Sequence, residues 1–258
     1  MLTFIGLGLY NYEDITLRGK KEIEKADVVF AEFYTSHLIG ESLESLSDKI
    51  GKEIKVLSRE EVENGRIIID AARDKNVVLL IAGDPMMATT HVSLRIMAEE
   101  RGIKTKIVHN ASIITAAPGL LGLQNYKFGR TVSLPFPQEN YFPTSAYDFI
   151  AENFARGLHT LILLDLNPRP MTANEAMDIL LKMEEKKEKG IITERSLIAV
   201  VARAGAPDCV LRAGHIEDLI NENFGPPLHT LVFPGKLHFA EEEALVRLAG
   251  APKDITRD

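Results

Sequence analysis

The chain begins with a short apolar run that ends on two glycines, LTFIGLG at residues 2–8. Such a run is typical of a buried strand, and glycines directly after it let a ligand approach the backbone closely. A second apolar run, at residues 77–81, is followed by the turn Gly83-Asp84-Pro85. Two strands that end in this way predict an α/β fold with a ligand site at the carboxyl edge of its sheet.

The residues around these two runs alternate between β-rich and amphipathic helical segments. Further strands are expected at residues 28–31, 54–57 and 106–108, and helices at residues 17–25, 41–50, 64–74 and 90–101. This alternation predicts strand-helix-strand units around a mostly parallel sheet. Ser58 and Glu61 have the spacing of a capping box, although they precede the helix expected from residue 64.

The second half of the chain has a different pattern. Strands are expected at residues 131–134, 160–164, 197–202, 209–213 and 230–233. Several of them follow one another without a helix between, which predicts a mixed or antiparallel sheet. Prolines and aromatic residues at 135–147 indicate a connecting loop, and Thr172 with Glu175 forms a capping box that opens a helix. We therefore expect two α/β domains, residues 1–112 and 113–258, the first with a mostly parallel sheet and the second with a mixed one.

Composition narrows the class of protein. The 258 residues are 45% hydrophobic and 26% charged, as in a folded globular protein, and 30 basic against 37 acidic residues give a net charge of −7. This charge disfavours a broad nucleic-acid-binding surface. The single cysteine, Cys209, excludes an intrachain disulfide, and no cysteine and histidine cluster suggests a zinc site. Apolar runs are too short for a membrane helix, so a cytoplasmic protein without a metal is expected.

The polar residues at the expected strand ends each allow a functional and a structural interpretation. Asp84 can accept hydrogen bonds from an ammonium group or ribose hydroxyls, and Met87 can pack on an apolar group, yet both also suit an ordinary turn. Ser112 can cap a helix or contact a ligand. Asn11 stands where a nicotinamide-binding signature has its third glycine, so that signature is weak.

No catalytic residue emerges from the motifs. His159 and His229 each precede an expected strand without a metal-binding or nucleophilic partner nearby, so neither is assigned an acid-base role. A phosphate-binding Gly-Lys-Ser/Thr motif and a Gly-x-Ser-x-Gly elbow are absent from the sequence. These absences disfavour phosphoryl transfer and serine hydrolysis.

Three segments together resemble the tetrapyrrole-methylase-like methyltransferases: Phe4-Ile5-Gly6-Leu7-Gly8-Leu9, Gly83-Asp84-Pro85 and Ala202-Arg203-Ala204-Gly205. Members of that family bind S-adenosyl-L-methionine in a cleft between two α/β domains. One group within the family is similar to this chain over longer stretches, at residues 29–36, 83–91, 126–129, 157–165, 171–176 and 227–238.

The resemblance implies a function that the motifs alone do not. It implies transfer of methyl groups from S-adenosyl-L-methionine to the amino group of a modified histidine on translation elongation factor 2, a step in making diphthamide that leaves S-adenosyl-L-homocysteine. It also implies a homodimer. By position, the cofactor contacts fall on Leu9, Asp84, Met87, Ser112, Ile113, Leu164, Ala204 and His229. A trimethylated, cationic product needs a tolerant pocket, for which Tyr10, Tyr12 and Phe33 are hypothetical candidates.

Other interpretations remain open at this point. A relative in the same family could methylate a tetrapyrrole or a ribosomal RNA base, although the net charge of −7 disfavours RNA. The chain could instead be a non-catalytic sensor of an adenosine ligand, or a nicotinamide oxidoreductase, against which Asn11 counts.

Overall fold

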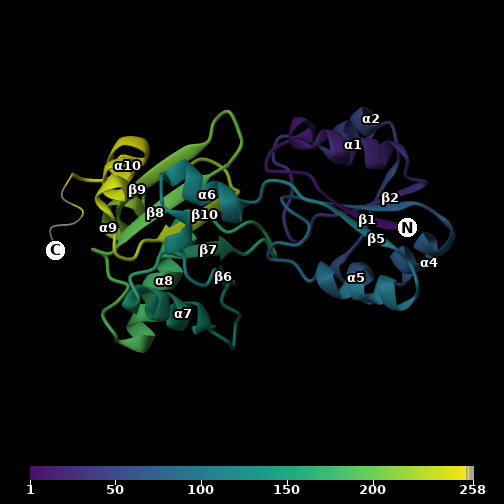
Figure 1. Cartoon of the computed structure of the whole chain (residues 1–258). Coiled ribbons are helices and arrows are strands. Elements are labelled where there is room, and N and C mark those ends of the chain that lie inside the picture. The colour runs from purple at the N-terminus through teal and green to yellow at the C-terminus, as the bar shows by residue number, and fades with distance from the viewer. Residues whose placement is uncertain (254, 256–258) are drawn as a thin grey trace. The chain divides into compact units, whose positions relative to one another are not determined.

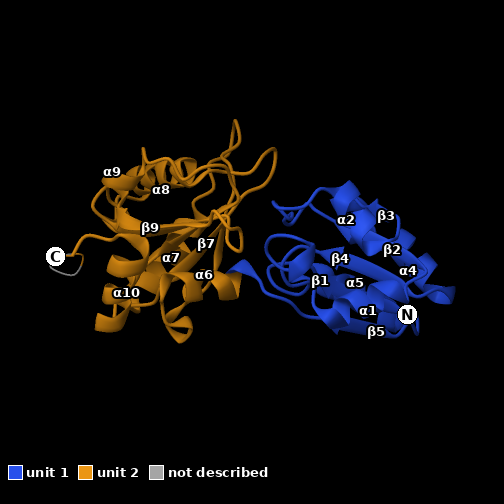
Figure 2. Cartoon of the chain, turned by 90° about the horizontal axis from the view of Figure 1, so that it is seen from above, with its two compact units in different colours: residues 1–113 blue, residues 114–258 orange. Residues whose placement is uncertain are grey.

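The computed structural model describes residues 1–253 and 255. It divides into two compact units, Met1–Ile113 and Ile114–Asp258, shown in different colours in Figure 2. Each unit is built around its own five-stranded sheet. No helix in the part of the chain that the structure describes is long and apolar enough to cross a membrane.

The sheet of the first unit is parallel throughout. Its strands lie in the order β3-β2-β4-β1-β5, and every neighbouring pair is parallel. Their bounds are β1 Leu2–Gly6, β2 Val28–Glu32, β3 Ile54–Val56, β4 Val77–Ile81 and β5 Thr105–Val108. The alternation of strand and helix patterns in the sequence therefore predicted the sheet type correctly, and each expected strand is present.

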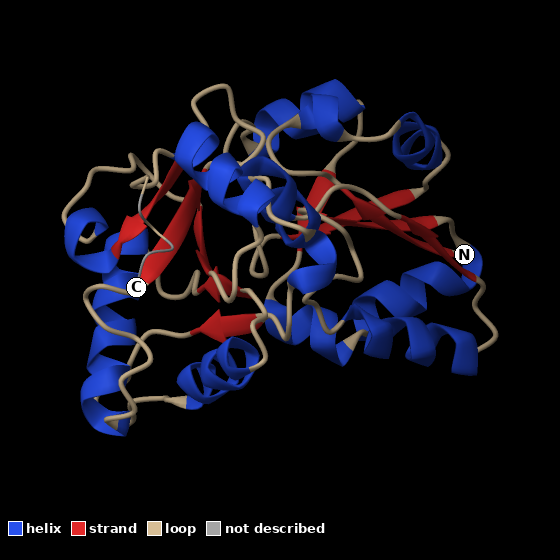
Figure 3. Ribbon diagram, turned by 60° about the vertical axis from the view of Figure 1, so that its left-hand side comes forward, coloured by secondary structure: helices blue, strands red, loops and turns tan. Residues whose placement is uncertain are grey.

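Helices cover both faces of this sheet (Figures 1 and 3). On one face, α1 (Leu17–Glu24) and α2 (Leu43–Ile50) pack on strand residues that include Ile5 and Leu80. On the other face, α3 (Arg59–Asn64), α4 (Arg66–Asp74) and α5 (His91–Glu100) pack on Phe4 and Leu79. After β1 the chain crosses one face through α1 and enters β2, whereas after β4 it crosses the other face through α5 and enters β5. The neighbouring strands β1 and β4 are therefore followed by helices on opposite faces, and the chain continues toward opposite edges of the sheet. Their carboxyl ends form the switch point at which open α/β sheets bind ligands.

The helix expected at residues 64–74 is in fact two helices. Gly65 has a φ of 72° and ends α3, and α4 begins at the next residue. The capping box of Ser58 and Glu61 is present and belongs to α3, which explains why it precedes the longer apolar run. The sequence pattern located the cap correctly but missed the break, because a glycine inside a helical pattern is ambiguous.

The second unit contains a mixed sheet, as predicted. Its strand order is β6-β7-β10-β8-β9, with β6 and β7 parallel and the other pairs antiparallel. The strands are β6 Val132–Leu134, β7 Thr160–Leu164, β8 Leu197–Ala202, β9 Val210–His215 and β10 His229–Phe233. The helices are α6 Ile113–Leu121, α7 Ser145–Ala155, α8 Ala173–Lys187, α9 Ile216–Leu219 and α10 Phe239–Ala249. In Figures 1 and 2, α8 and α10 lie on opposite faces of this sheet.

The expectation of a loop throughout residues 135–147 is wrong at its end. Ser145–Ala155 forms α7, and Tyr147 is fully buried with its hydroxyl donating a hydrogen bond to Glu184 Oε2 at 2.7 Å. The prolines stop at Pro143, and Ala146, Tyr147 and Ile150 then follow the spacing of a buried helix face. The loop therefore ends before Ser145, and Tyr147 belongs to the core and not to the loop.

Candidate functional site

The turns after β1 and β4 are hydrogen-bonded to each other. The amide of Gly8 donates to the carbonyl of Gly83 at 3.2 Å, and the amide of Gly83 donates to the carbonyl of Gly8 at 2.7 Å. Both residues are left-handed, with φ of 83° at Gly8 and 72° at Gly83, a conformation that favours glycine. The two glycine turns that the sequence singled out therefore form one structure at the switch point.

Gly6 is required by a close approach of backbones. A Cβ at this position would lie 2.5 Å from the carbonyl oxygen of Gly83, 2.8 Å from Cβ of Asn110 and 3.0 Å from Cδ of Pro85. Gly83 and Pro85 belong to the turn after β4, and Asn110 belongs to the loop after β5. Only glycine lets the three loops meet at this distance.

Replacing Gly6 with alanine is therefore expected to lower the free energy of unfolding by about 1–3 kcal/mol, as overpacking does. Denaturant unfolding measures the change. Gly119 is the control, because it lies in α6 and a Cβ there would meet nothing within 4 Å. Gly119→Ala should stabilise the protein by about 0.5–1 kcal/mol, and an equal loss in both variants would contradict the close-approach argument.

Asp84 joins the turn after β4 to the loop after β5. Its carboxylate accepts the amide of Met86 at Oδ1 (2.9 Å), and at Oδ2 the amide of Asn110 (3.1 Å) and Nδ1 of His109 (2.8 Å). The side chain is 6% exposed. Asp84 is thus more than a turn residue, because its carboxylate holds two loops in a fixed arrangement.

Two further residues complete this arrangement, and sequence reasoning missed both. Asn110 Nδ2 donates to the carbonyls of Gly6 and Asp14, each at 2.9 Å. Asp14 Oδ2 in turn accepts the amides of Leu9 (3.0 Å) and Tyr10 (2.7 Å). Short polar side chains that bond nearby backbone are typical of such loops, but their partners at Gly6 and Asp14 are distant in sequence, and no local pattern identifies them.

Five of the eight predicted cofactor positions lie at this edge of the first unit. Leu9 follows β1, Asp84 and Met87 follow β4, and Ser112 and Ile113 follow β5. Asp84 and Ser112 are each 6% exposed, whereas Met87 is 41% exposed. The strand order makes β1 the neighbour of both β4 and β5, so the three loops are adjacent.

The other three predicted positions lie together at one edge of the second unit's sheet. Leu164 ends β7, Ala204 follows β8, and His229 begins β10. Because β10 is antiparallel to both neighbours, its first residue meets their carboxyl ends: His229 is paired with Ala202, and Thr230 with Leu163.

The ring of His229 is fully engaged within the second unit. Nδ1 accepts the amide of Ala173 at 3.0 Å, so Nε2 carries the hydrogen and donates to the carbonyl of Pro226 at 3.1 Å. Burial lowers the pKa of His229, which favours this neutral ring. The imidazole therefore holds a loop in place and has no nitrogen left to take a proton from a substrate.

Arg203 is a buried cation that the sequence places in a motif but to which sequence reasoning gave no role. Its guanidinium donates to the carbonyls of Phe224 (2.6 Å), Pro226 (2.8 Å) and Asp208 (2.9 Å), and Nε donates to Asp208 Oδ2 (2.7 Å). The residue is 7% exposed. It fastens the loop that carries Ala204 to the loop that precedes His229.

The aromatic rings suggested for a cationic product already have other neighbours. The ammonium of Lys20 lies 3.9 Å from the centroid of the Tyr12 ring. The Tyr10 ring lies so close to Gly40 that a Cβ there would be 2.4 Å from Cζ of the tyrosine. Phe33 packs against the core on the α1 face.

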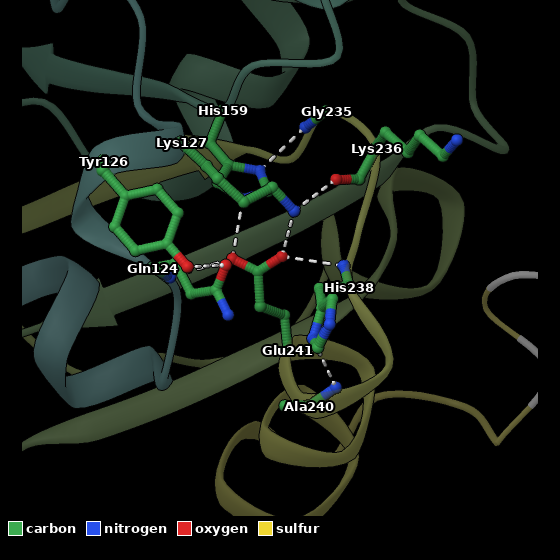
Figure 4. A network of polar contacts seen from close by, with 9 residues as sticks. All are labelled: Gln124, Tyr126, Lys127, His159, Gly235, Lys236, His238, Ala240 and Glu241. Atoms are coloured by element: carbon green, nitrogen blue, oxygen red, sulfur yellow. Dashed lines mark hydrogen bonds and ion pairs between the residues drawn. The ribbon is translucent and has the colours of Figure 1, made fainter.

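A second polar cluster surrounds the carboxylate of Glu241, the third residue of α10 (Figure 4). Oε1 accepts Nε2 of His159 at 3.0 Å and the amide of Gln124 at 2.8 Å, while Oε2 accepts the ammonium of Lys127 and the amide of His238 at 2.8 Å. Both Glu241 and His159 are fully buried. The cluster fastens α10 to segments more than 80 residues earlier in the chain.

The electrostatics of this cluster favour a charged carboxylate and a neutral imidazole. Burial by itself raises the pKa of Glu241, but the hydrogen bonds from Lys127, Gln124, His238 and His159 outweigh it and lower the pKa to about 2. Burial lowers the pKa of His159, whose Nδ1 accepts the amide of Gly235 at 3.0 Å. An acidic residue in the first turn of a helix suits the helix dipole, which accounts for the place of Glu241 in α10 but not for its partners.

Among residues 1–253 and 255, no group of three or more histidine, cysteine, aspartate or glutamate side chains could hold a metal ion.

Comparison with known proteins gives consistent matches along the chain. Residues 1–220 match the family model described as Tetrapyrrole (Corrin/Porphyrin) Methylases. A diphthine synthase of Methanothermobacter thermautotrophicus is 50% identical over 99% of this chain and 98% of its own. A diphthine synthase of Methanocaldococcus jannaschii is 51% identical over 95% of this chain and 97% of its own.

Solved structures agree with these relatives. A crystal structure of diphthine synthase superposes with a TM-score of 0.92 at 38% identity, covering 99% of this chain and 98% of that one. A crystal structure of a putative diphthine synthase from Entamoeba histolytica superposes with a TM-score of 0.87 at 35% identity, covering 98% of this chain and 99% of that one. The similarity thus extends over both units.

Proposed function

This chain belongs to the tetrapyrrole methylase family and, within it, to the diphthine synthases, and from that premise we propose how its residues serve methyl transfer. It is an S-adenosyl-L-methionine-dependent methyltransferase of diphthamide biosynthesis. The acceptor we propose is the amino group of a modified histidine on translation elongation factor 2, which is methylated to the trimethyl state. The observation that carries the proposal is 50% identity over 99% of the chain to a diphthine synthase.

Two features of the loops in the first unit suit an adenosine-containing cofactor: an open stretch of backbone and a buried hydrogen-bond acceptor. A Cβ on Gly83 would meet nothing closer than 3.9 Å, so the backbone of this turn is open where a side chain would stand. Beside it lies the buried carboxylate of Asp84, an acceptor that suits hydroxyl or ammonium donors. We propose cofactor contacts at Leu9, Asp84, Met87, Ser112 and Ile113 in this unit.

In the second unit we propose cofactor contacts at Leu164, Ala204 and His229. Both ring nitrogens of His229 are engaged by Ala173 and Pro226. Its contribution is therefore assigned to the backbone and the ring face, and not to proton transfer. Arg203 supports the same region, because its guanidinium donates to the carbonyl of Asp208 in the loop after β8 and to the carbonyl of Phe224 in the loop before β10.

The chemistry requires little acid-base machinery. The sulfonium of the bound cofactor supplies an activated methyl group. What the chain must add is orientation of a neutral amine in line with that methyl and exclusion of water. The network of Asp84, Asn110 and Asp14 provides the rigidity that such orientation needs, because each loop is hydrogen-bonded to another.

The other activities considered have weaker support. Full-length identity near 50% to diphthine synthases disfavours a tetrapyrrole or ribosomal RNA substrate and a non-catalytic sensor. We also propose that the protein is a homodimer and that it releases S-adenosyl-L-homocysteine as the second product.

Incubation with labelled S-adenosyl-L-methionine and elongation factor 2 that carries the diphthamide precursor tests the proposal. Label is expected on the modified histidine, with mass increases of one, two and three methyl groups. Elongation factor 2 whose target histidine has been replaced is the control and should stay unlabelled. Labelling of a small tetrapyrrole, with none on the factor, would overturn the proposed substrate.

A further inference from the structure

Glu32 and His91 form a buried pair that the proposed chemistry does not use. Glu32 ends β2 and His91 begins α5, and both side chains are completely buried. His91 Nε2 lies 3.6 Å from Glu32 Oε1. This pair lies beside the turn after β4, because Glu32 is in register with Ile81 in the sheet.

The tautomer of His91 follows from its other nitrogen. Nδ1 lies 3.0 Å from the carbonyl oxygen of Pro85, which can only accept a hydrogen bond. Nδ1 therefore carries a hydrogen. In a neutral ring this leaves a lone pair on Nε2, which is buried and has no hydrogen-bond partner among the described residues.

Glu32 is held as an acceptor on the other side of this gap. Oε2 accepts the amides of Tyr34 and Thr35, each at 3.1 Å, and Oε1 accepts the hydroxyl of Thr35. Burial raises the pKa of Glu32. A charged carboxylate facing an imidazole lone pair in a site sealed from water is unfavourable, since neither group supplies a hydrogen.

The other ionisable groups near the pair do not supply that hydrogen. Burial and the Glu32 charge raise the pKa of Tyr34 to about 12, and its buried hydroxyl has no hydrogen-bond partner among the described residues. The guanidinium of Arg59 lies 5.2 Å from the Tyr34 ring, and Glu63 acts on the same phenol from α3. Among the described interactions, none of these groups forms a hydrogen bond or ion pair with His91 Nε2 or Glu32 Oε1.

We propose that Glu32 and His91 hold one proton between them and, through the Pro85 carbonyl, position the turn that carries Asp84 and Met87. The positioning role rests on the proposed function, in which this turn contacts the cofactor. The same carbonyl also accepts the hydroxyl of Thr89 at 2.9 Å, so Pro85 is held from two sides. Glu32 and His91 are positioning residues, and neither is assigned a contact with the cofactor.

Proton linkage gives the first test. An unfolded histidine loses its proton near pH 6.5 and an unfolded glutamate near pH 4.3. If the folded pair keeps one proton, the native state binds more protons than the unfolded chain above about pH 6.5, and stability falls as pH rises. In Glu32→Gln the amide hydrogens can bond both Thr35 and the Nε2 lone pair, so no proton is needed, and stability falls instead as pH drops below about 6.5.

The wild-type folding equilibrium constant divided by that of Glu32→Gln should therefore fall about tenfold per pH unit between pH 5.5 and 7.5. Denaturant unfolding at several pH values measures this ratio, in which the other titrating groups cancel. Glu63→Gln, at an exposed glutamate of the same region, is the matched control and should give a flat ratio. A flat ratio for Glu32→Gln as well would overturn the shared proton.

Two replacements of His91 test the positioning role. In His91→Asn the amide nitrogen lies near the former position of Nδ1, so a donor for the Pro85 carbonyl is kept. In His91→Gln the amide nitrogen lies near the former position of Nε2, so a donor for Glu32 is kept and the donor for Pro85 is lost. The dissociation constant for S-adenosylhomocysteine, measured by calorimetry, should rise at least tenfold more in His91→Gln than in His91→Asn. Equal weakening would overturn the link through Pro85. Wild-type protein that binds no S-adenosylhomocysteine would instead refute the proposed function and with it the positioning role, and the pH ratio would still decide the shared proton.

Discussion

Asp84→Ala is expected to raise the dissociation constant for S-adenosylhomocysteine about 100-fold, a loss of about 2.7 kcal/mol. The carboxylate accepts the amides of Met86 and Asn110 and Nδ1 of His109. Alanine removes the acceptor and leaves the two partly buried amides without a partner, and an unsatisfied buried donor costs about 1–3 kcal/mol. The His109 ring is 68% exposed and can bond water instead. The turn after β4 and the loop after β5 then lose the connection that fixes their arrangement.

Isothermal titration calorimetry of the wild type and the variant measures the change. Asp84→Asn separates charge from shape, because an amide of the same size keeps one acceptor oxygen but presents two hydrogens to the remaining donors. It is expected to weaken binding less than alanine does. Asp70→Ala is the matched control at an exposed aspartate of α4 and should bind normally. An unchanged dissociation constant in Asp84→Ala would show that the carboxylate has no part in cofactor binding.

Glu241→Ala is expected to lower the free energy of unfolding by about 3–5 kcal/mol, the cost of removing one partner of a buried ion pair. The fully buried carboxylate accepts the ammonium of Lys127, the ring of His159 and two backbone amides. Without it, the Lys127 charge is left with one described partner, the carbonyl of Lys236. Because Glu241 also forms the capping box of α10 with His238, the amide of His238 loses its acceptor and the cap of that helix is weakened at the same time.

Denaturant unfolding tests this expectation, and its pH dependence gives an independent check. The pKa of Glu241 is about 2 in the folded protein against an ordinary value of 4.5. Its stabilisation should therefore be complete above about pH 4.5 and decrease as pH falls toward 2, so wild type and variant should converge in acid. Glu243→Ala, at an exposed glutamate of the same helix, is the control. A loss below 1 kcal/mol at pH 7, equal to that of the control, would show that the ion pair contributes little.

Much of the fold could be read from local patterns. The apolar runs at residues 2–5 and 77–81 became β1 and β4, and both capping boxes, at Ser58 and Thr172, cap helices. The failures occurred where a signal has two meanings. Gly65 inside a helical pattern divides two helices, and the aromatic residues before Ser145 continue into a helix whose Tyr147 is core.

The site was only partly predictable, for a related reason. Gly8, Gly83 and Asp84 carry a local signature, since a strand that ends on glycine or aspartate indicates a turn. Asn110 carries none, because its partners at Gly6 and Asp14 are set by which strands are neighbours. No local signature assigns a role to Asp14 or Arg203 either, although each bonds residues four or five positions away. The bond from Asn110 to Gly6 joins residues 104 positions apart, and that from Glu241 to His159 joins residues 82 apart.

The sequence by itself therefore determined the strands, the type of each sheet and, through its similarity to diphthine synthases, the chemistry. Only the tertiary structure decided that β1 lies between β4 and β5, which brings Gly6, Gly83 and Asn110 within contact distance. It also showed that Glu32 and His91 face each other out of water. The physical reason is range: backbone periodicity and capping act over a few neighbouring residues, whereas strand order and the burial of charged pairs depend on how distant segments pack.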